Sequence, residues 1–247
     1  MFNIITKKEY FDWLKNGFAV ETGHSLKDIQ DASILNIFKN LENIDFMKSN
    51  FSFFDKFKKN TGEKKIAEMG GGHSRVLKRI KNNVECWNIE PFNGKGNGPT
   101  EIKKIKKIKN VKTYLGEFSD DLSENYFDVV FSISVLEHVP RDKLKGVFED
   151  IYRILKKGGR TYHMIDIYLG DEPELDSVSS RLIDTIKDIV KDKFDFVEEP
   201  KLDDDLKFKT NYASNSDLAM YSWNLVVPEE RKFIKQSVSL KLGLIKK

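Results

Sequence analysis

Between Lys64 and Ile167 the chain alternates short apolar runs with segments of helical periodicity, and this pattern constrains the fold more than any other feature. Such alternation is typical of an α/β protein in which helices cover the faces of a parallel sheet. We expect strands at Lys65–Met69, Val84–Ile89, Val111–Leu115, Phe127–Ile133 and Thr161–Ile167, and helices at Ser74–Lys81, Thr100–Lys109 and Arg141–Leu155.

The segments on either side of this region have patterns of their own. Apolar spacings of three and four predict amphipathic helices in residues 1–60, which we interpret as an N-terminal helical cap. Residues 61–247 then form the core, with a substrate-side insertion at about 168–236 that includes a helix at Ser177–Lys191. Strict alternation along Ser237–Leu244 predicts a last strand, antiparallel to its neighbours, at the edge of the sheet.

Composition limits the class of protein. The 42 Lys and Arg against 39 Asp and Glu give a net charge of +3, which is too balanced for a dedicated nucleic-acid binder. The single Cys86 cannot form an internal disulfide, and the first residues lack the apolar run of a signal peptide. No apolar stretch is long enough to span a membrane. We therefore expect a cytoplasmic protein without nucleic-acid partners or membrane insertion, and its oligomeric state stays open.

The segment from Glu68 to Ser74 carries the most chemical information. It runs from a predicted strand through Gly70–Gly72 into a predicted helix. Glycines at such a turn let the backbone bend sharply and let a ligand approach without meeting a β-carbon. Arg75 follows Ser74, so the third glycine of the dinucleotide fingerprint is missing, and the loop has no Lys of a phosphate-cradling type. An NAD site is therefore disfavoured.

The order acid-x-Gly-x-Gly-x-Ser resembles the first motif of the class I methyltransferases that use S-adenosylmethionine. The resemblance implies a Rossmann-like, doubly wound, mostly parallel sheet, with S-adenosylmethionine as cofactor and a small molecule as substrate. In that family the acid lies near the methionine portion of the cofactor, where a carboxylate can complement an ammonium group. The residues that match this motif are Glu68, Gly70, Gly71, Gly72 and Ser74. The alternative is a plain strand-to-helix turn.

Two further cofactor contacts follow from the next strands. Glu90 ends the second predicted strand, 18 positions after Gly72, and a carboxylate at that place can accept hydrogen bonds from both ribose hydroxyls. After the third strand, the resemblance implies that Glu117 and Phe118 contact the adenine ring. The alternatives are a surface acid at Glu90 and an ordinary turn at Glu117.

The run from Tyr126 to Pro140 resembles the fourth motif of the same family. It implies a structural role for Asp128 and places Ser132 and Ser134 near the bound methionine. The following Leu-Glu-His-Val stretch places His138 where ligands bind to open parallel sheets. His138 is our candidate general base, because an imidazole can accept a proton at neutral pH. The alternative is a histidine that caps or packs at the start of the next helix.

We assign no metal. Some relatives bind a divalent ion through Glu-x-x-Glu-His, but here the first position is Ser134, so one carboxylate ligand is missing. His163 and Asp166 could join His138 only by convergence from different segments.

The acceptor must be recognised by what is added to the core. Segments at 215–230 and 237–241 resemble the tails of methyltransferases associated with bacterial surface polysaccharide synthesis. We therefore expect O-methylation of a small polar acceptor, such as a sugar, a sugar nucleotide or a phosphorylated capsule precursor. N-methylation of a small amine, or a non-catalytic cofactor-binding module, are the alternatives.

Overall fold

The computed structural model describes residues 1–18, 26–46, 64–80, 84–91, 111–116, 121–169, 173–201 and 236–247, with side chains left out at 168–169, 173–180 and 236–237. The strands of the described residues are β1 (Phe2–Ile4), β2 (Lys64–Met69), β3 (Val84–Ile89), β4 (Val111–Tyr114), β5 (Phe127–Ile133), β6 (Leu155–Leu169), β7 (Phe194–Phe196) and β8 (Gln236–Lys246). The α-helices of these residues are α1 (Lys7–Lys15), α2 (Leu26–Asn40), α3 (Arg141–Ile154) and α4 (Pro173–Val190). Two 3-10 turns, Leu77–Arg79 and Leu136–His138, follow β2 and β5.

The described strands form one sheet in the order β1-β8-β6-β5-β2-β3-β4, and β7 also pairs with β8. The strands β2 to β6 are mutually parallel, whereas β8 runs antiparallel to β6. The sheet is thus mostly parallel and doubly wound, with an antiparallel strand at the C-terminus, as the sequence predicted. The short β1 and β7 both pair with the outer side of β8, so the prediction that the C-terminal strand lies at the edge of the sheet was wrong.

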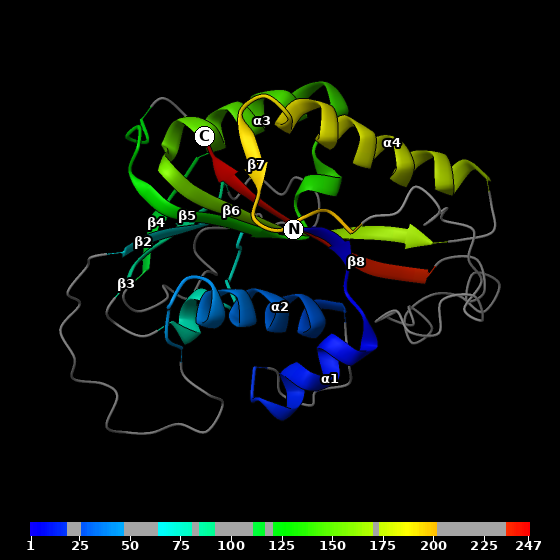
Figure 1. Ribbon diagram of the computed structural model, residues 1–247. Coiled ribbons are helices and arrows are strands. Elements are labelled where there is room, and N and C mark those ends of the chain that lie inside the picture. The colour runs from blue at the N-terminus through cyan, green and yellow to red at the C-terminus, as the bar shows by residue number, and fades with distance from the viewer. Residues whose placement is uncertain are drawn as a thin grey trace.

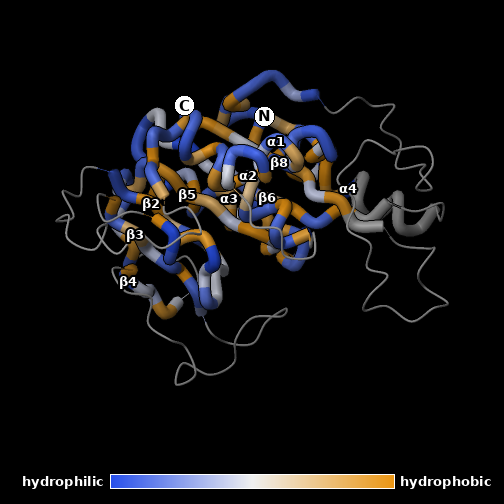
Figure 2. The backbone as a smooth tube through the Cα atoms, turned by 90° about the horizontal axis from the view of Figure 1, so that it is seen from below, coloured by the Kyte–Doolittle hydropathy of each residue, from blue (hydrophilic) through white to orange (hydrophobic). Residues whose placement is uncertain are grey.

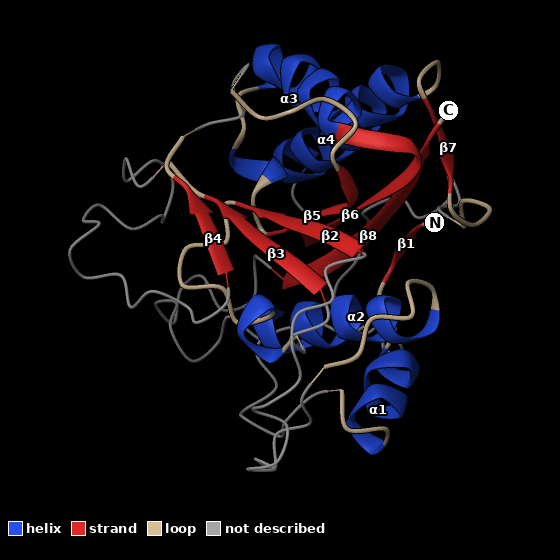
Figure 3. Cartoon of the chain, turned by 90° about the vertical axis from the view of Figure 1, so that its left-hand side faces the viewer, coloured by secondary structure: helices blue, strands red, loops and turns tan. Residues whose placement is uncertain are grey.

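Helices cover both faces of the sheet. The helices α3 and α4 lie on one face, and α1 and α2 lie on the other (Figures 1 and 3). Hydrophobic residues recur along the central strands and on the helices that pack against them (Figure 2). On the second face the Phe38 ring of α2 meets the Phe131 ring of β5 edge to face, with 5.1 Å between centroids. An edge-to-face pair of buried rings fixes the position of the helix as well as burying area.

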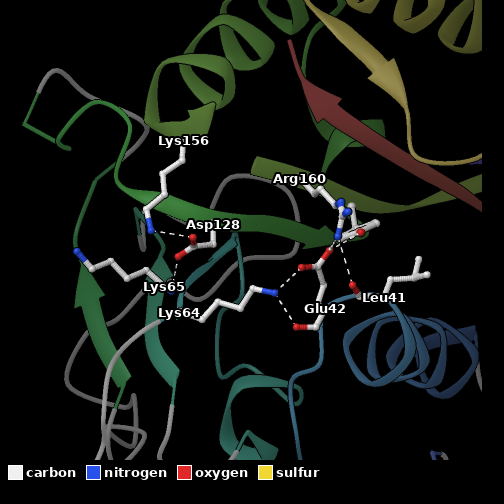
Figure 4. Close-up of polar contacts among 8 residues, drawn as sticks. Leu41, Glu42, Lys64, Lys65, Asp128, Lys156 and Arg160 are labelled. Atoms are coloured by element: carbon white, nitrogen blue, oxygen red, sulfur yellow. Dashed lines mark hydrogen bonds and ion pairs between the residues drawn. The ribbon is translucent and has the colours of Figure 1, made fainter. Parts of the chain in front are cut away.

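Two acids, the buried Glu42 and the partly exposed Asp128, hold the amino-terminal ends of the strands (Figure 4). Glu42, which follows α2, accepts hydrogen bonds from Lys64 Nζ at 2.7 Å and Arg160 Nη1 at 3.0 Å. Asp128 of β5 accepts from the Lys65 backbone N–H at 2.8 Å and from Lys156 Nζ at 2.7 Å. These contacts connect α2, β2, β5 and β6 at the edge of the sheet opposite to the glycine loop.

One expected helix does not form. In place of a helix at Ser74–Lys81 the structure has turns and the 3-10 turn Leu77–Arg79, and Ile80 is extended and bridged to Phe46. The Arg75 guanidinium binds Asp31 of α2, at 2.6 and 2.8 Å. Tertiary contacts with α2 and with Phe46 therefore override the local helical periodicity.

The other boundaries differ less. The fifth predicted strand begins earlier than Thr161, because β6 follows α3 directly, and Gly158 (φ +73°) lies in β6 where the pairing with β5 shifts register. The expected helix at Ser177–Lys191 corresponds to α4, and the last strand extends over Gln236–Lys246. The expected helix at Thr100–Lys109 lies outside the described residues.

Candidate active site

The glycine loop that follows β2 is packed so tightly that it has no space for β-carbons. Gly70 has φ +65°, and a β-carbon there would lie 2.8 Å from Val135 Cγ2. A β-carbon on Gly71 would lie 2.5 Å from Asn88 Oδ1 and 2.8 Å from Glu68 Cδ. Side chains from β2, β3 and the segment after β5 therefore enclose the loop, and only glycine fits at these two positions.

Glu68 holds the loop from inside. Its side chain is buried, and the Ser74 hydroxyl donates a hydrogen bond to its carboxyl group. The Ser74 hydroxyl also accepts a hydrogen bond from the Leu77 N–H at 2.9 Å. Burial raises the pKa of Glu68 to about 8, although the hydrogen bond from Ser74 acts in the opposite direction. Glu68 and Ser74 thus join the two ends of the loop.

Glu90 meets the same loop from the end of β3. Its Oε2 accepts a hydrogen bond from the Gly72 N–H at 2.9 Å. Asn88 Nδ2 donates to the Gly72 carbonyl, also at 2.9 Å. The structure therefore brings together the acid and the glycine that lie 18 positions apart in the sequence. The parallel pairing of β2 with β3 ends at Met69 and Ile89, and the Gly70 N–H donates to the Ile89 carbonyl at 2.8 Å, so the strand pairing already brings the start of the loop beside Glu90.

The two candidate serines of β5 and its end lie on opposite faces of the sheet. Ser132 is buried on the α3 face, where its Oγ lies 2.7 Å from His163 Nδ1. His163 Nε2 lies 2.8 Å from Thr161 Oγ1, and burial lowers the pKa of His163 to about 3. Ser134 lies on the α2 face, with its Oγ 2.6 Å from Asp166 Oδ1. His163 and Asp166 consequently do not converge on one point.

His138 lies in the 3-10 turn after β5 and its side chain is half-exposed. Its Nε2 is 4.0 Å from Oε1 of the neighbouring Glu137, whose side chain is only 9% exposed. Burial, and next the charge of Asp166, raise the pKa of Glu137 to about 8. A buried acid and an accessible histidine therefore stand side by side at the carboxyl end of β5.

Gln30 of α2 is a site residue that the sequence analysis missed. It is fully buried, and its Nε2 donates to Asp166 Oδ1 at 2.6 Å and to Ser239 Oγ at 3.3 Å. Its Oε1 lies 2.9 Å from Ser134 Oγ. One amide thus connects α2 with the ends of β5, β6 and β8. A polar residue inside an apolar helical pattern was the only signal in the sequence.

Two of the expected contacts cannot be placed. Glu117 and Phe118 lie outside the described residues, as does the segment 215–230. Within the described ranges no three His, Cys, Asp or Glu side chains are grouped as a metal site would require. Of the helices that the structure describes, none is long and apolar enough to cross a membrane.

A comparison with protein families identifies the centre of this arrangement. Residues 67–163 match the family described as a methyltransferase domain. The match begins inside β2 and ends inside β6, so it includes the glycine loop, Glu90, Ser134 and His138. The methyltransferase resemblance of the sequence is confirmed for this part of the chain.

Curated proteins similar to this chain include two fungal sterol 24-C-methyltransferases. The chain is 37% identical to erg-4 of Neurospora crassa over 76 residues, which are 30% of this chain and 18% of erg-4. It is 30% identical to ERG6 of Saccharomyces cerevisiae over 118 residues, which are 44% of this chain and 30% of ERG6. The chain thus matches less than a third of the length of either relative.

Among solved structures, the YcgJ protein of Bacillus subtilis is similar at 13% identity and a TM-score of 0.46. The similarity covers 75% of this chain and 92% of YcgJ.

Proposed function

We propose that this chain is an S-adenosylmethionine-dependent methyltransferase. The observation that carries the proposal is the hydrogen bond of 2.9 Å from the Gly72 N–H to Glu90, which sets a carboxylate beside a loop of three glycines. A carboxylate at the end of a strand beside such a loop is suited to the two hydroxyls of a ribose. The family match over residues 67–163 supports the same activity.

The residues present fit the cofactor in chemistry. Glu90 would accept hydrogen bonds from the ribose hydroxyls, and Gly70–Gly72 would follow the methionine portion. Glu68 and Ser74 would keep the loop in shape from inside, and Ser134, on the α2 face, would stand nearer to the methionine than the inward-facing Ser132. We keep Glu117 and Phe118 as proposed contacts to adenine. When bound, the cofactor supplies an electrophilic methyl group on a sulfonium.

For the transfer itself, we propose O-methylation of a small polar acceptor such as a sugar, a sugar nucleotide or a phosphorylated capsule precursor. A hydroxyl nucleophile must lose a proton, and we propose the half-exposed His138 as the general base that accepts it. Its Nε2 lies 4.0 Å from a Glu137 oxygen, so a protonated imidazole would have a carboxyl group nearby. The contribution of the protein is otherwise to orient the nucleophile in line with the sulfur–methyl bond.

Calorimetric titration with S-adenosylmethionine and S-adenosylhomocysteine tests the proposal. We expect saturable binding of both and at least tenfold weaker binding by Glu90→Ala, because a hydrogen bond to a charged group contributes about 1.5–3 kcal/mol. Glu149→Ala, which removes a half-exposed acid on α3, is the control that should bind normally. Folded protein that binds neither compound would refute the proposal.

A transfer assay with a labelled methyl group then separates the enzyme from a binding module. Across sugar and sugar-nucleotide acceptors, His138→Ala should lose most of the transfer while its cofactor affinity stays within twofold. Transfer to amines alone would favour N-methylation, and cofactor binding without transfer would favour the non-catalytic module.

A further inference from the structure

Two acids from different elements face each other at the carboxyl ends of the parallel strands. Asp166 belongs to β6 and is well supplied with donors. Its Oδ1 accepts from Gln30 Nε2 and from Ser134 Oγ, both at 2.6 Å. Lys27 Nζ lies 3.9 Å from its Oδ2. Asp166 therefore has a fixed orientation and a full set of contacts.

Glu137 differs from Asp166 in having no such donors. Nine-tenths of its side chain is buried, and neither carboxyl oxygen has a hydrogen-bond partner among the described residues. The backbone amides of Glu137 and Asp166 lower its pKa slightly, but they do not reach hydrogen-bonding geometry. A buried carboxyl group without a partner is costly, so its presence points to a group that arrives from outside the chain and donates hydrogen bonds.

The charges around Glu137 indicate which kind of group this is. The charged or titratable groups that face it are Asp166 on β6, Lys27 on α2 and His138 on its own turn. Lys27 has a half-exposed side chain and offsets one of the two acids. Burial is the main cause of the raised pKa of Glu137, and the negative charge of Asp166 raises that pKa further. An anion would be repelled here, whereas a cation with several donors would pair with both acids.

This pair of acids lies next to the proposed cofactor loop. Val135, two residues before Glu137, packs against Gly70 so closely that a β-carbon there would come within 2.8 Å of Cγ2. Ser134, the residue before Val135, contacts Asp166 directly. A group bound between Glu137 and Asp166 would therefore be close to the methionine end of the cofactor and to His138.

We propose that Glu137 and Asp166 bind an ammonium group of the methyl acceptor. The proposal rests on the proposed methyltransferase function and narrows its substrate to amine-bearing small molecules. The ammonium would donate to both acids, and the nucleophile, on an adjoining atom, would lie toward His138. A divalent metal fits less well, because among the described residues Glu137, Asp166 and His138 do not form a group of three ligands that could hold one.

Two small probes of equal size test this inference. Ethanolamine carries an ammonium group and ethylene glycol a second hydroxyl in its place. Ligand-observed NMR on the whole protein, with and without S-adenosylhomocysteine, should show ethanolamine binding at least tenfold more tightly than ethylene glycol. Glu137→Gln and Asp166→Asn should each weaken ethanolamine binding at least tenfold, and Glu149→Gln should leave it unchanged.

Several results would overturn the inference. If the wild-type protein bound ethanolamine and ethylene glycol equally, the inference would be wrong. This result needs no variant, so it holds even if both variants fail to fold. Weaker S-adenosylhomocysteine binding by Glu137→Gln would assign Glu137 to the cofactor instead. If the protein bound Mg²⁺ and Glu137→Gln weakened that binding, Glu137 would belong to a metal site instead. Ethanolamine binding by protein that does not bind S-adenosylhomocysteine would support the subsite and refute the proposed function.

Discussion

At the scale of single residues, two buried acids near the loop have similar pKa values and different surroundings. Burial raises the pKa of Glu68 and of Glu137 to about 8 in each case. Glu68 receives a hydrogen bond from Ser74, whereas the carboxyl oxygens of Glu137 have no hydrogen-bond partner among the described residues. Glu68 thus has its hydrogen-bond partner within the protein and stabilises the shape of the loop. Glu137 is left for a ligand, which is why we assign them different roles.

The Glu68 side chain makes stability depend on pH. Its folded-state pKa of about 8 lies above the ordinary value of 4.5, so the folded state holds the proton that the unfolded state has lost. Its contribution to stability is therefore full below pH 4.5 and is lost as the pH rises to about 8. Within that window the slope is on the order of 1 kcal/mol per pH unit. Glu68→Gln should remove this contribution to the slope, and the contribution of Glu137, whose pKa is also raised to about 8, should remain.

Urea unfolding at pH 5, 6, 7 and 8 measures this effect as the difference between wild type and Glu68→Gln. Glu149→Gln should keep the slope of the wild type, because its side chain is half-exposed. Parallel pH profiles for wild type and Glu68→Gln would show that Glu68 titrates normally in the folded protein.

Gly71 allows a direct comparison of two glycine substitutions. Gly71→Ala puts a β-carbon 2.5 Å from Asn88 Oδ1 and should destabilise the protein by about 1–3 kcal/mol and weaken cofactor binding. In helix α3 a β-carbon on Gly146 meets nothing within 4 Å, so Gly146→Ala should stabilise by about 0.5–1 kcal/mol. Thermal unfolding of the two variants measures the opposite changes in stability, and calorimetric titration measures the change in cofactor affinity. Similar behaviour of the two alanines would contradict the tight packing of the loop.

At the scale of elements, α2 is the helix that connects the loop with the acids. Its Asp31 binds Arg75 beside the glycine loop, at 2.6 Å from Arg75 Nε. Gln30, the residue before Asp31, and Lys27, one turn before Asp31, reach Asp166 of β6. The same helix packs Phe38 on the ring of Phe131. A helix fixed at both ends in this way holds the two halves of the site at a constant separation.

Gln30→Leu tests the contribution of this helix. Leucine keeps the bulk of Gln30 but removes its hydrogen bonds to Asp166 and to the buried Ser239, and an unsatisfied buried polar group costs about 1–3 kcal/mol. We expect the free energy of unfolding to fall by that amount. Asn40→Leu, at the exposed end of α2, should change it by less than about 0.5 kcal/mol. Chemical denaturation of both variants gives the comparison, and equal losses would argue against a special role for Gln30.

The sequence predicted well those strands and helices whose conformation depends on their own local residue pattern. The strands Val84–Ile89 and Phe127–Ile133 were predicted with the bounds that the structure has, because both segments are rich in the β-branched and aromatic residues that favour strands. The helix at Ser74–Lys81 was predicted wrongly, because Arg75 and Ile80 take their conformations from partners distant in sequence. Local periodicity contains no information about such partners.

The same distinction holds for the site. Glu68 and the glycines form a local motif, and Glu90 lies at a regular distance from it. Gln30 and Asp166 are 136 positions apart, and no spacing rule joins them. Ser132 and Ser134 would share a face on a regular strand, but the positive φ of Ser134 (+52°) follows the strand end and turns the side chain to the other face.

At the scale of the whole molecule, β8 connects the two ends of the chain to the middle of the sheet. It pairs with β6 from Arg160 to Leu169 on one side, and with β1 and β7 on the other. The N-terminal strand and the C-terminal strand therefore lie side by side (Figure 1). Lys241 of β8 extends this contact to Glu9 of α1, at 2.5 Å. Residues from both ends of the chain thus complete one edge of the sheet that bears the site.

If the edge is part of one cooperative unit, a cavity in β8 should lower the stability of the whole molecule. Leu242 is fully buried and pairs with Phe2 of β1 and His163 of β6. Leu242→Ala should cost about 2–5 kcal/mol, out of a total that is typically about 5–15 kcal/mol for a folded domain. Leu115→Ala, at a side chain that is 55% exposed after β4, is the matched control and should cost less than about 0.5 kcal/mol.

The decisive measurement follows urea unfolding of Leu242→Ala with two probes at once. Far-ultraviolet circular dichroism reports the whole sheet, and the fluorescence of Trp87 in β3, read after replacing Trp13 and Trp223 by Phe, reports the opposite side of it. One cooperative unit requires that both transitions shift together to lower urea, because β8 reaches β3 only through β6, β5 and β2. A shifted circular dichroism transition with an unchanged Trp87 transition would instead divide the molecule into an edge that unfolds alone and a core that keeps the site.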